Sequence, residues 1–433
     1  MTISTKKYPK VLLVHLTKVH QKDAVNLMLR NLFGDWPKEN LAQIYTGDYR
    51  GTGDFCGHYF KIGIKERRLG WLFHALKPMG MEALSGYSLS NEIAKVRVSR
   101  VQRWIANVVS NFVALGYWEV LFNVRSSDAL LEFIHEFKPE ILYTQGYSLN
   151  LTRLSLEIAE RLKIPICYFP MDDWHLSLYE GSYLHRHVEE IATRVAQNAS
   201  VRFALGPKMA ETLTSRYNVL FECLYHADSP ERFNVSRDPK NSTRNEFVVG
   251  YVGSLYLGRS SAIQDLLKAC ALINYPFRIE VYCENIPTDI PQELISSPSV
   301  VFLPLPDHNQ LPGVLVNCDM LFLPESFESK YKSAIELSLS TKAHLYMFSR
   351  RPIVVYGPPW SGTVDYAKRF GWGIVIEQQD IQLLAEGIKA AFSSQAKDFV
   401  QKAYNTALLN HDIKKLRAKV HKEITATVWG NER

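Results

Sequence analysis

The sequence predicts an α/β protein built from two doubly wound domains that face each other across a cleft. With 433 residues the chain is longer than one hydrophobic core usually grows, so we expect two domains. Short apolar segments alternate with amphipathic helical segments, and this alternation begins again after a polar stretch at residues 226–246. Two parallel sheets in tandem predict a ligand site at the carboxyl ends of their strands.

The first domain is expected over residues 1–235. Its strands are apolar runs without polar alternation, which is typical of strands buried on both faces of a parallel sheet. A proline follows each of the helical segments "SDALLEFIHEF" and "LTRLSLEIAERLK" and ends it before the next strand. The predicted strands cover residues 10–16, 41–45, 139–146, 164–170 and 201–206.

The second domain is expected over residues 236–409, because the polar stretch at 226–246 is the best linker candidate. About six strand-like runs lie between Phe247 and Glu377, and helical sequence follows Asp380. These runs are "FVVGYVGSL", "RIEVYCE", "VVFLPLP", "MLFLPE", "PIVVYGP" and "GIVIE".

Charge and composition restrict the partners only broadly. The net charge of +6 permits attraction to phosphates, nucleotides or an anionic membrane, but the excess is small and no nucleic-acid recognition motif is present. Six cysteines without a Cys-x-x-Cys pair predict buried, reduced thiols and a cytosolic compartment, with no metal site. Because no signal peptide or spanning apolar segment is evident, we expect a soluble or peripheral protein.

The segment "VGYVGSLYLGRSSAIQDLLKAC" predicts a strand, a glycine-containing turn and a helix. Gly253 lets a ligand approach the backbone, Ser260 or Ser261 can cap the helix, and its first amide groups attract an anion. Arg259 stands just before that helix and can donate to phosphate oxygens. A purely structural turn is the alternative explanation.

A second anion-binding turn is expected in "LSLSTKAHLYMF". Ser340 is a plausible N-cap, which places Thr341 and Lys342 in the first helical turn. A lysine there opposes the helix dipole unless an anion neutralises it, so the residue indicates a bound anion. The alternative is a solvated lysine that costs a few tenths of a kcal/mol.

These two segments, with "CDMLFLPES" and "RRPIVVYGPPWSGTVDYAKRFGWGIVIE", resemble the second domain of glycosyltransferases with the GT-B fold. The resemblance is to family-four-like enzymes of bacterial surface-polysaccharide clusters. It implies two Rossmann-like domains, a terminal helix at about 410–433 that packs on the first domain, and a nucleotide-diphosphate sugar as donor without another cofactor. Arg259 and Lys342 would contact the diphosphate, with Gly253, Ser254, Ser340 and Thr341 beside them.

Two departures from the family pattern affect the donor site. Many relatives carry two glutamates with seven residues between them, the second on the ribose, but those positions here are Leu337 and Leu345. We expect Glu325 or Glu328, after the strand "MLFLP", to supply that contact. The turn "HLTKVHQKD" also lacks the glycine that relatives often place near the diphosphate.

The segment "FPMDDWH" follows a predicted strand and should face the cleft. Two adjacent carboxylates repel each other, so Asp172 and Asp173 need partners; either could orient an acceptor hydroxyl or act as base, and His175 could transfer a proton. The alternative is a helix cap with a solvated acid. The residues expected to contact an acceptor are Trp174, Gln145 and Tyr147.

Residues 95–116 predict a basic amphipathic helix, and Lys65, Arg67 and Arg68 form a second basic cluster. Such a helix can lie on an anionic membrane and would suit a lipid-linked acceptor, although packing on its own domain is the more common outcome. The sequence and its family resemblance together predict a metal-independent glycosyltransferase acting on a glycan, lipid-linked or small-molecule hydroxyl, and the resemblance implies that the anomeric configuration is retained. The alternatives are another GT-B enzyme, such as an epimerase, and a silent nucleotide-sugar-binding partner protein.

Overall fold

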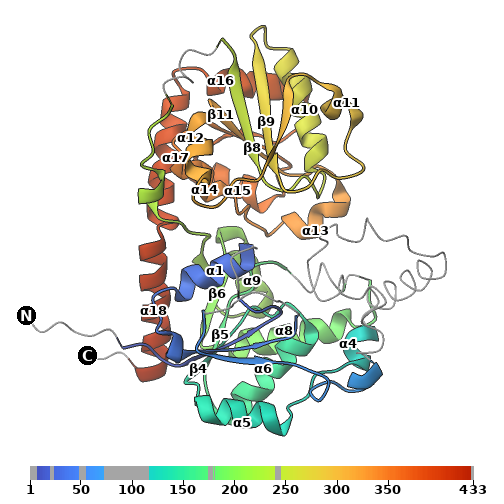
Figure 1. Cartoon of the computed structure of the whole chain (residues 1–433), viewed down its shortest axis with the longest axis vertical. Helices are drawn as coiled ribbons and strands as arrows, with labels where there is room; N and C mark the ends of the chain where they lie inside the picture. The colour runs from blue at the N-terminus through green and yellow to red at the C-terminus, as the bar shows by residue number, and fades with distance from the viewer. Residues whose placement is uncertain are drawn as a thin grey trace, which may run out of the picture. The chain divides into compact units, whose positions relative to one another are not determined.

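The computed structural model describes residues 7–19, 24–47, 55–72, 117–173, 179, 181–238 and 245–430 (Figure 1). Internal contacts divide the chain into two compact units. Unit 1 contains residues 1–204, 210–223 and 417–433, and unit 2 contains residues 205–209 and 224–416. The predicted amphipathic helix at 95–116 lies outside the described residues, and so do Trp174 and His175.

Unit 1 is built on a seven-stranded sheet with the order β3-β2-β1-β4-β5-β6-β7. Each neighbouring pair from β3 to β6 in this order is parallel. The order runs outward in both directions from β1, which defines a doubly wound sheet. The strands are β1 Val11–His15, β2 Leu41–Tyr45, β3 His58–Lys61, β4 Ile141–Thr144, β5 Ile166–Tyr168, β6 Val201–Leu205 and β7 Glu222–Leu224.

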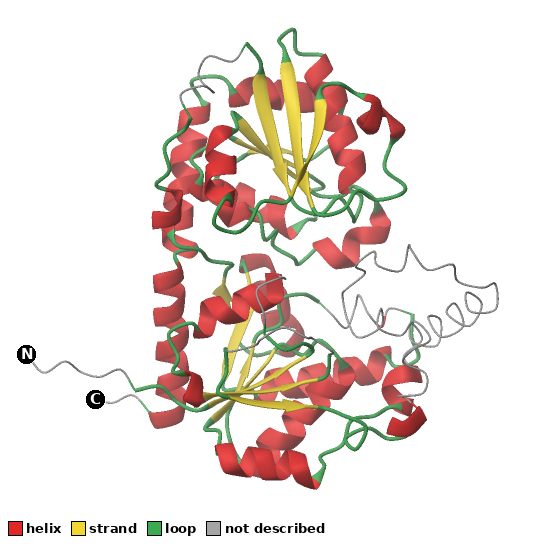
Figure 2. Cartoon of the chain, viewed as in Figure 1, coloured by secondary structure: helices red, strands yellow, loops and turns green. Residues whose placement is uncertain are grey.

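Helices cover both faces of this sheet (Figure 2). Ser127 and Ser148 begin two of them, each accepting a hydrogen bond from the backbone N–H three residues later, and Lys138 and Lys163 end them in the left-handed conformation. The helices are α1 Ala24–Phe33, α4 Tyr117–Leu121, α5 Asp128–Phe137, α6 Leu149–Leu162, α8 His185–Asn198, α9 Pro207–Tyr217 and α18 Ile413–Trp429, with the 3₁₀ helix η1 Lys38–Asn40.

Unit 2 carries a six-stranded parallel sheet with the order β10-β9-β8-β11-β12-β13, so the order reverses between β8 and β11. Every residue of β8, β11 and β12 is buried, as the apolar runs predict. The strands are β8 Phe247–Val252, β9 Phe277–Cys283, β10 Val300–Pro304, β11 Met320–Pro324, β12 Ile353–Tyr356 and β13 Ile374–Ile376.

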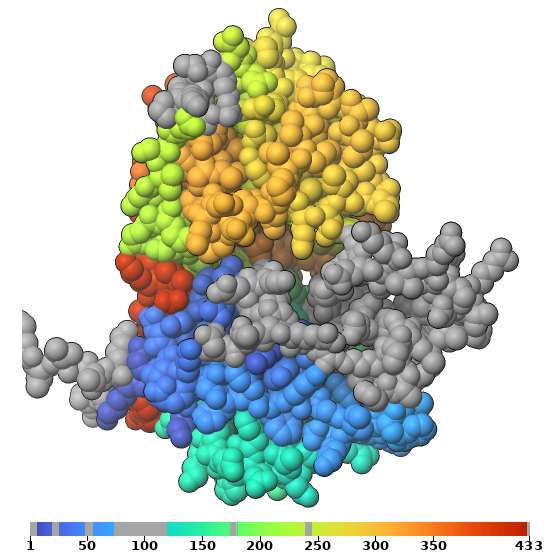
Figure 3. All heavy atoms as spheres, in the orientation of Figure 1, coloured from blue at the N-terminus to red at the C-terminus, as the bar shows by residue number. Residues whose placement is uncertain are grey.

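Apolar side chains of helices such as α10 and α16 pack with those of this sheet in one buried core. Figure 3 shows one face of the molecule as spheres, with much of unit 2 in yellow and orange. Within the described part of the chain, no helix has both the length and the apolar character needed to cross a membrane. The helices are η5 Pro230–Phe233, α10 Arg259–Ala271, α11 Gln292–Ser296, α12 Leu311–Asn317, η7 Ser329–Tyr331, α13 Lys332–Ile335, α14 Ala343–Phe348, α15 Gly362–Phe370, α16 Ile381–Ala391 and α17 Ala396–Asn410.

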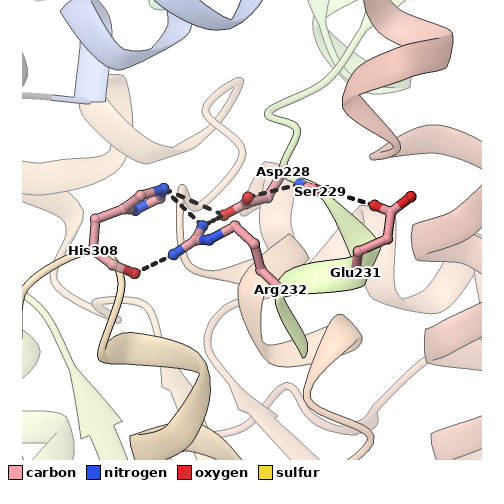
Figure 4. A network of polar contacts seen from close by, with 5 residues as sticks. All are labelled: Asp228, Ser229, Glu231, Arg232 and His308. Atoms are coloured by element: carbon pink, nitrogen blue, oxygen red, sulfur yellow. Dashed lines mark hydrogen bonds and ion pairs between the residues drawn. The ribbon is translucent and has the colours of Figure 1, made fainter. Parts of the chain in front are cut away.

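The first part of the polar stretch expected to be a linker is packed into unit 2. Asp228 is buried, and its carboxylate pairs with Arg232, whose guanidinium also donates to the carbonyl oxygen of His308 before α12 (Figure 4). The backbone N–H of Asp228 donates to the carbonyl oxygen of His411 at 3.0 Å. Within the described part of this stretch, Asp228 and Arg232 thus form an ion pair with each other, and Arg237 pairs with Asp319 before β11.

Candidate functional site

The candidate site of unit 2 lies at the carboxyl ends of β8 and β11, where the strand order reverses. Gly253 follows β8 with a φ of +134°, a conformation that favours glycine. A Cβ atom on Gly253 would lie 3.1 Å from Cδ and 3.5 Å from Nζ of Lys342. The missing side chain therefore allows Lys342 to lie directly against the backbone after β8.

Arg259 is the first residue of α10 and approaches a buried carboxylate. Its Nη2 lies 3.4 Å from Oε2 of Glu325, and only 14% of the Arg259 side chain and 4% of the Glu325 side chain are exposed. Burial alone would lower the pKa of Arg259, but the charge of Glu325 raises it above its ordinary value. The Nε of Arg259 is buried and has no acceptor among the described residues.

Lys342 is the second cation of the site. Burial, and then the charge of Arg259, lower the pKa of Lys342 to about 7, while Glu325 acts in the opposite direction. Its Nζ lies 5.8 Å from the ring centroid of Tyr251. Among the described residues, no carboxylate forms an ion pair with Lys342, because the nearby Glu325 is bound to Arg259 and Thr363.

The predicted helix caps of this site are wrong. Helix α14 begins at Ala343 with Lys342 as its N-cap, so Ser340 does not cap it. The Ser340 Oγ is buried and has no hydrogen-bond partner in the described part of the chain, whereas its backbone N–H donates to Thr363 Oγ1 at 2.9 Å. The N-cap of α10 is Gly258, which places Ser260 and Ser261 in the first helical turn.

Gly258 is required at that cap by packing as well as by conformation. Its φ is +72°, and a Cβ atom there would collide with Oγ of Ser326. The remaining predicted residues are more open: Ser254 is exposed and accepts from Tyr256 N–H at 3.2 Å, and Thr341 is half-buried in the turn before α14.

Glu325 and Glu328, expected near a ribose, have different environments. Both carboxylate oxygens of Glu325 are engaged by the protein, one with Arg259 and the other with the Thr363 hydroxyl at 2.9 Å. Glu328 is more exposed and forms an ion pair with Lys330 at 2.7 Å. A small cavity of about 20 Å³ lies between them, lined by Gly258, Ser261, Ala262, Asp265, Glu325, Ser326, Phe327, Glu328 and Gln379.

In unit 1, Asp173 follows β5 and forms a bidentate ion pair with Arg216 of α9, at 2.7 and 2.8 Å. Asp173 is buried, and its charge raises the pKa of Arg216 against the opposing effect of burial. Asp172 is half-buried beside it. The ion pair satisfies Asp173 and gives it a structural partner.

Gln145 and Tyr147, after β4, are both buried. The Gln145 Nε2 donates to the Tyr143 hydroxyl at 3.1 Å and contacts the Met171 sulfur at 3.2 Å, so the ends of β4 and β5 lie together as expected for neighbouring strands. The ring of Tyr147 meets the ring of His15 at 6.2 Å in an edge-on contact.

Sequence reasoning did not identify Thr363, which links Glu325 to the segment before Lys342. The only local signal was its position after a strand that ends in "YGPP", because turns at strand ends carry binding residues in doubly wound sheets. The pairing of Arg259 with Glu325 was not predicted either.

No protein-family model matches the sequence, and no curated protein matches it. Solved structures do. HepE from Anabaena, in complex with UDP and glucose, matches with a TM-score of 0.61 at 12% identity over 97% of this chain and 100% of that chain. Sucrose-phosphate synthase from Thermosynechococcus elongatus matches with a TM-score of 0.61 at 11% identity, covering 96% of this chain and 99% of that chain.

WaaG, a glycosyltransferase involved in lipopolysaccharide biosynthesis, matches with a TM-score of 0.56 at 14% identity, covering 96% of this chain and 99% of that chain. At such identities the likeness establishes the fold. Together with the two strand orders, it confirms the predicted GT-B architecture of two Rossmann-like domains.

Proposed function

We propose that this protein is a glycosyltransferase that moves a sugar from a nucleotide-diphosphate sugar to a hydroxyl acceptor. The observation that carries the proposal is the pair of cations at the strand reversal of unit 2. Lys342 lies against Gly253 without a carboxylate of its own, and Arg259 lies beside it. The solved structures of HepE with UDP and with UDP-glucose support a nucleotide-sugar as the ligand class.

The two cations would hold the leaving group. During transfer the acceptor oxygen bonds to the anomeric carbon, the bond from that carbon to the phosphate oxygen breaks, and the nucleoside diphosphate leaves with the electron pair. Lys342 and Arg259 would stabilise this developing charge without a metal ion. The acceptor proton passes to a base, for which we propose Asp172. Retention of anomeric configuration is proposed from the family resemblance.

A catalytically silent nucleotide-sugar-binding protein is the second candidate. Leu345, a half-buried residue of α14, occupies the position where many relatives carry the ribose-binding glutamate. Turnover of a nucleotide-sugar by the purified protein, lost in Lys342→Ala, would contradict this alternative. Interconversion of the donor without an acceptor would instead indicate an epimerase.

We further propose a lipid-linked acceptor in polysaccharide biosynthesis, with cytoplasmic protein at the inner face of a membrane. Trp71 is 67% exposed, Ile64 is 48% exposed, and Lys65 and Arg68 are exposed in the same segment. Arg67 adds less to this surface, because it is half-buried near Glu66 and Glu119. Vesicle co-sedimentation tests the proposal: binding should increase with anionic lipid and decrease in Trp71→Ala, and lipid-independent behaviour would refute it.

The donor assignment is tested first by thermal unfolding with a panel of nucleotide-sugars. A ligand that binds the folded state raises the unfolding temperature by mass action. We expect at least one nucleotide-diphosphate sugar to stabilise the protein, and the effect to disappear in the Arg259→Gln and Lys342→Met variants. The absence of stabilisation by every member of the panel would refute the proposed function.

A further inference from the structure

A buried polar chain links Arg259 to the backbone segment before Lys342 through Thr363, the second residue of α15. The backbone N–H of Ser340 donates to Thr363 Oγ1 at 2.9 Å, and the Thr363 hydroxyl donates to Glu325 Oε1 at 2.9 Å. The other oxygen of Glu325 lies 3.4 Å from Arg259 Nη2. The chain therefore runs from the segment before Lys342 to the guanidinium of Arg259.

The direction of these hydrogen bonds follows from the chemistry of the groups. A backbone N–H can only donate, so the threonine oxygen accepts from Ser340 and its single hydrogen is available for the carboxylate. Thr363 is fully buried, and the exposures of Glu325 and Ser340 are 3% and 7%. Water cannot readily replace a lost partner in such a place, so each group depends on the next.

Close packing holds Thr363 in this position. A Cβ atom on the preceding Gly362 would lie 2.5 Å from the carbonyl oxygen of Ser338, so α15 begins in close contact with the segment that leads to Ser340. A Cβ atom on Gly357 would similarly lie 2.9 Å from Cβ of Glu325. The β-branched side chain of threonine is also restricted in rotation about its first bond. The hydroxyl thus has a fixed place between its two partners.

We propose that Thr363 is a positioning residue for the donor site. Its hydroxyl orients Glu325, which keeps the Arg259 guanidinium directed into the site, and it fixes the segment that carries Lys342. The inference rests on the proposed function, since it assigns this hydroxyl a role in binding the diphosphate. It also gives Glu325 a role that differs from the predicted ribose contact.

The experiment compares Thr363→Val, which keeps the shape and removes the hydroxyl, with Thr363→Ser, which keeps the hydroxyl. The matched control is Thr406→Val, a buried threonine of α17. Calorimetric titration measures binding of inorganic pyrophosphate, UDP and uridine, and thermal unfolding measures stability separately.

We expect Thr363→Val to weaken binding of pyrophosphate and UDP by about ten- to a hundredfold, the range for a lost hydrogen bond to a charged group. Uridine, which has no phosphate, should bind each variant as it binds the wild type. Thr363→Ser should lie within about threefold of the wild type, because the hydrogen-bonding group is restored. Where a nucleotide-sugar is turned over, Thr363→Val should raise the donor KM and leave the acceptor KM unchanged.

A folded Thr363→Val protein with wild-type affinity for pyrophosphate and UDP would overturn the proposal, even if its stability were lower. Should that variant not fold, Glu325→Gln carries the test, because it keeps a side-chain acceptor for Thr363 and removes the charge facing Arg259. We expect the same loss of affinity there, and unchanged affinity would overturn the inference. Failure of the wild type to bind pyrophosphate, UDP or any nucleotide-sugar would instead refute the proposed function.

Discussion

Binding of a diphosphate should be accompanied by uptake of a proton at Lys342. In the free protein burial and Arg259 lower the pKa of Lys342 to about 7, so above neutral pH much of the population is uncharged. A bound diphosphate favours the charged form and raises this pKa again. Affinity must therefore fall as the pH rises above about 7, because binding then requires a proton from solution.

The size of this effect follows from Coulomb's law. A negative charge of the diphosphate about 4 Å from the Lys342 ammonium stabilises the protonated form by about 4 kcal/mol at an effective dielectric constant near 20. This energy corresponds to a rise of about three units in the pKa of Lys342. The pKa of Lys342 in the complex then lies above 9, and affinity falls about tenfold per pH unit between pH 7 and 9. At pH 8 binding should take up about 0.9 proton.

Calorimetry in two buffers with different heats of ionisation measures the uptake directly. The ligand should be the nucleotide-diphosphate sugar that gives the largest thermal stabilisation, since its pyrophosphate diester has a constant charge over this pH range. Lys342→Arg is the matched variant, because arginine stays protonated and should bind without proton uptake. Lys342→Met should bind about thirtyfold or more weakly at pH 7. Wild-type binding with no proton uptake and no pH dependence would refute the reasoning.

Three further predictions concern stability and local geometry. Burial lowers the pKa of His226 to about 3 and that of His411 to about 4, below the ordinary value of 6.5. Between pH 6.5 and 4 the unfolded chain therefore binds more protons than the folded one, and the free energy of unfolding should fall by about 1.4 kcal/mol per pH unit for each histidine. Urea unfolding at a series of pH values measures this fall. Asp173→Asn should lower that free energy by about 2–3 kcal/mol through loss of the ion pair with Arg216, and leave UDP affinity unchanged. Gly253→Ala should weaken UDP binding about tenfold or more, because a left-handed φ and the nearby Lys342 side chain both oppose a Cβ atom.

Each of these has a matched control. His135→Gln, an exposed position of α5, should leave the acid sensitivity unchanged, whereas His411→Gln should reduce it; equal curves for all three proteins would contradict the assignment. Asp289→Asn, at an exposed position, should retain stability, and a fully stable Asp173→Asn would show that its ion pair contributes little. A Cβ atom at Gly313 would meet open space, so the Gly313→Ala variant should bind UDP as the wild type does. An equal loss of affinity in this variant would show that the effect of Gly253→Ala is not specific to the site.

Most strands of the two sheets could be predicted because each is marked by an apolar run within its own short segment of sequence. Strands β8, β11 and β12 are continuous apolar runs, and a run buried on both faces is readable without knowing its neighbours. The strands that were missed, β3 and β7, lie at the two edges of their sheet and carry partly exposed polar residues. Edge strands lack the double burial that makes an interior strand recognisable.

The candidate site was only partly predictable. Gly253, Arg259 and Lys342 could be recognised from their local sequence, as a glycine after a strand and two cations near the starts of helices. The structure brings the three residues together, and their binding of a diphosphate stays a prediction. Ser340 shows the opposite case, since a good capping residue is displaced by a hydrogen bond to Thr363, 23 residues further along the chain. The partner of Arg259 is 66 residues away, and such pairings arise from tertiary packing that no local pattern encodes.

The most direct test of the central claim is a crystal structure of the protein with bound UDP. We predict that the diphosphate lies in unit 2, with its oxygens within hydrogen-bonding distance of Lys342 Nζ and of the Arg259 guanidinium, and close to the backbone at Gly253. A diphosphate bound elsewhere on the chain, or one that touches neither cation, would contradict the account.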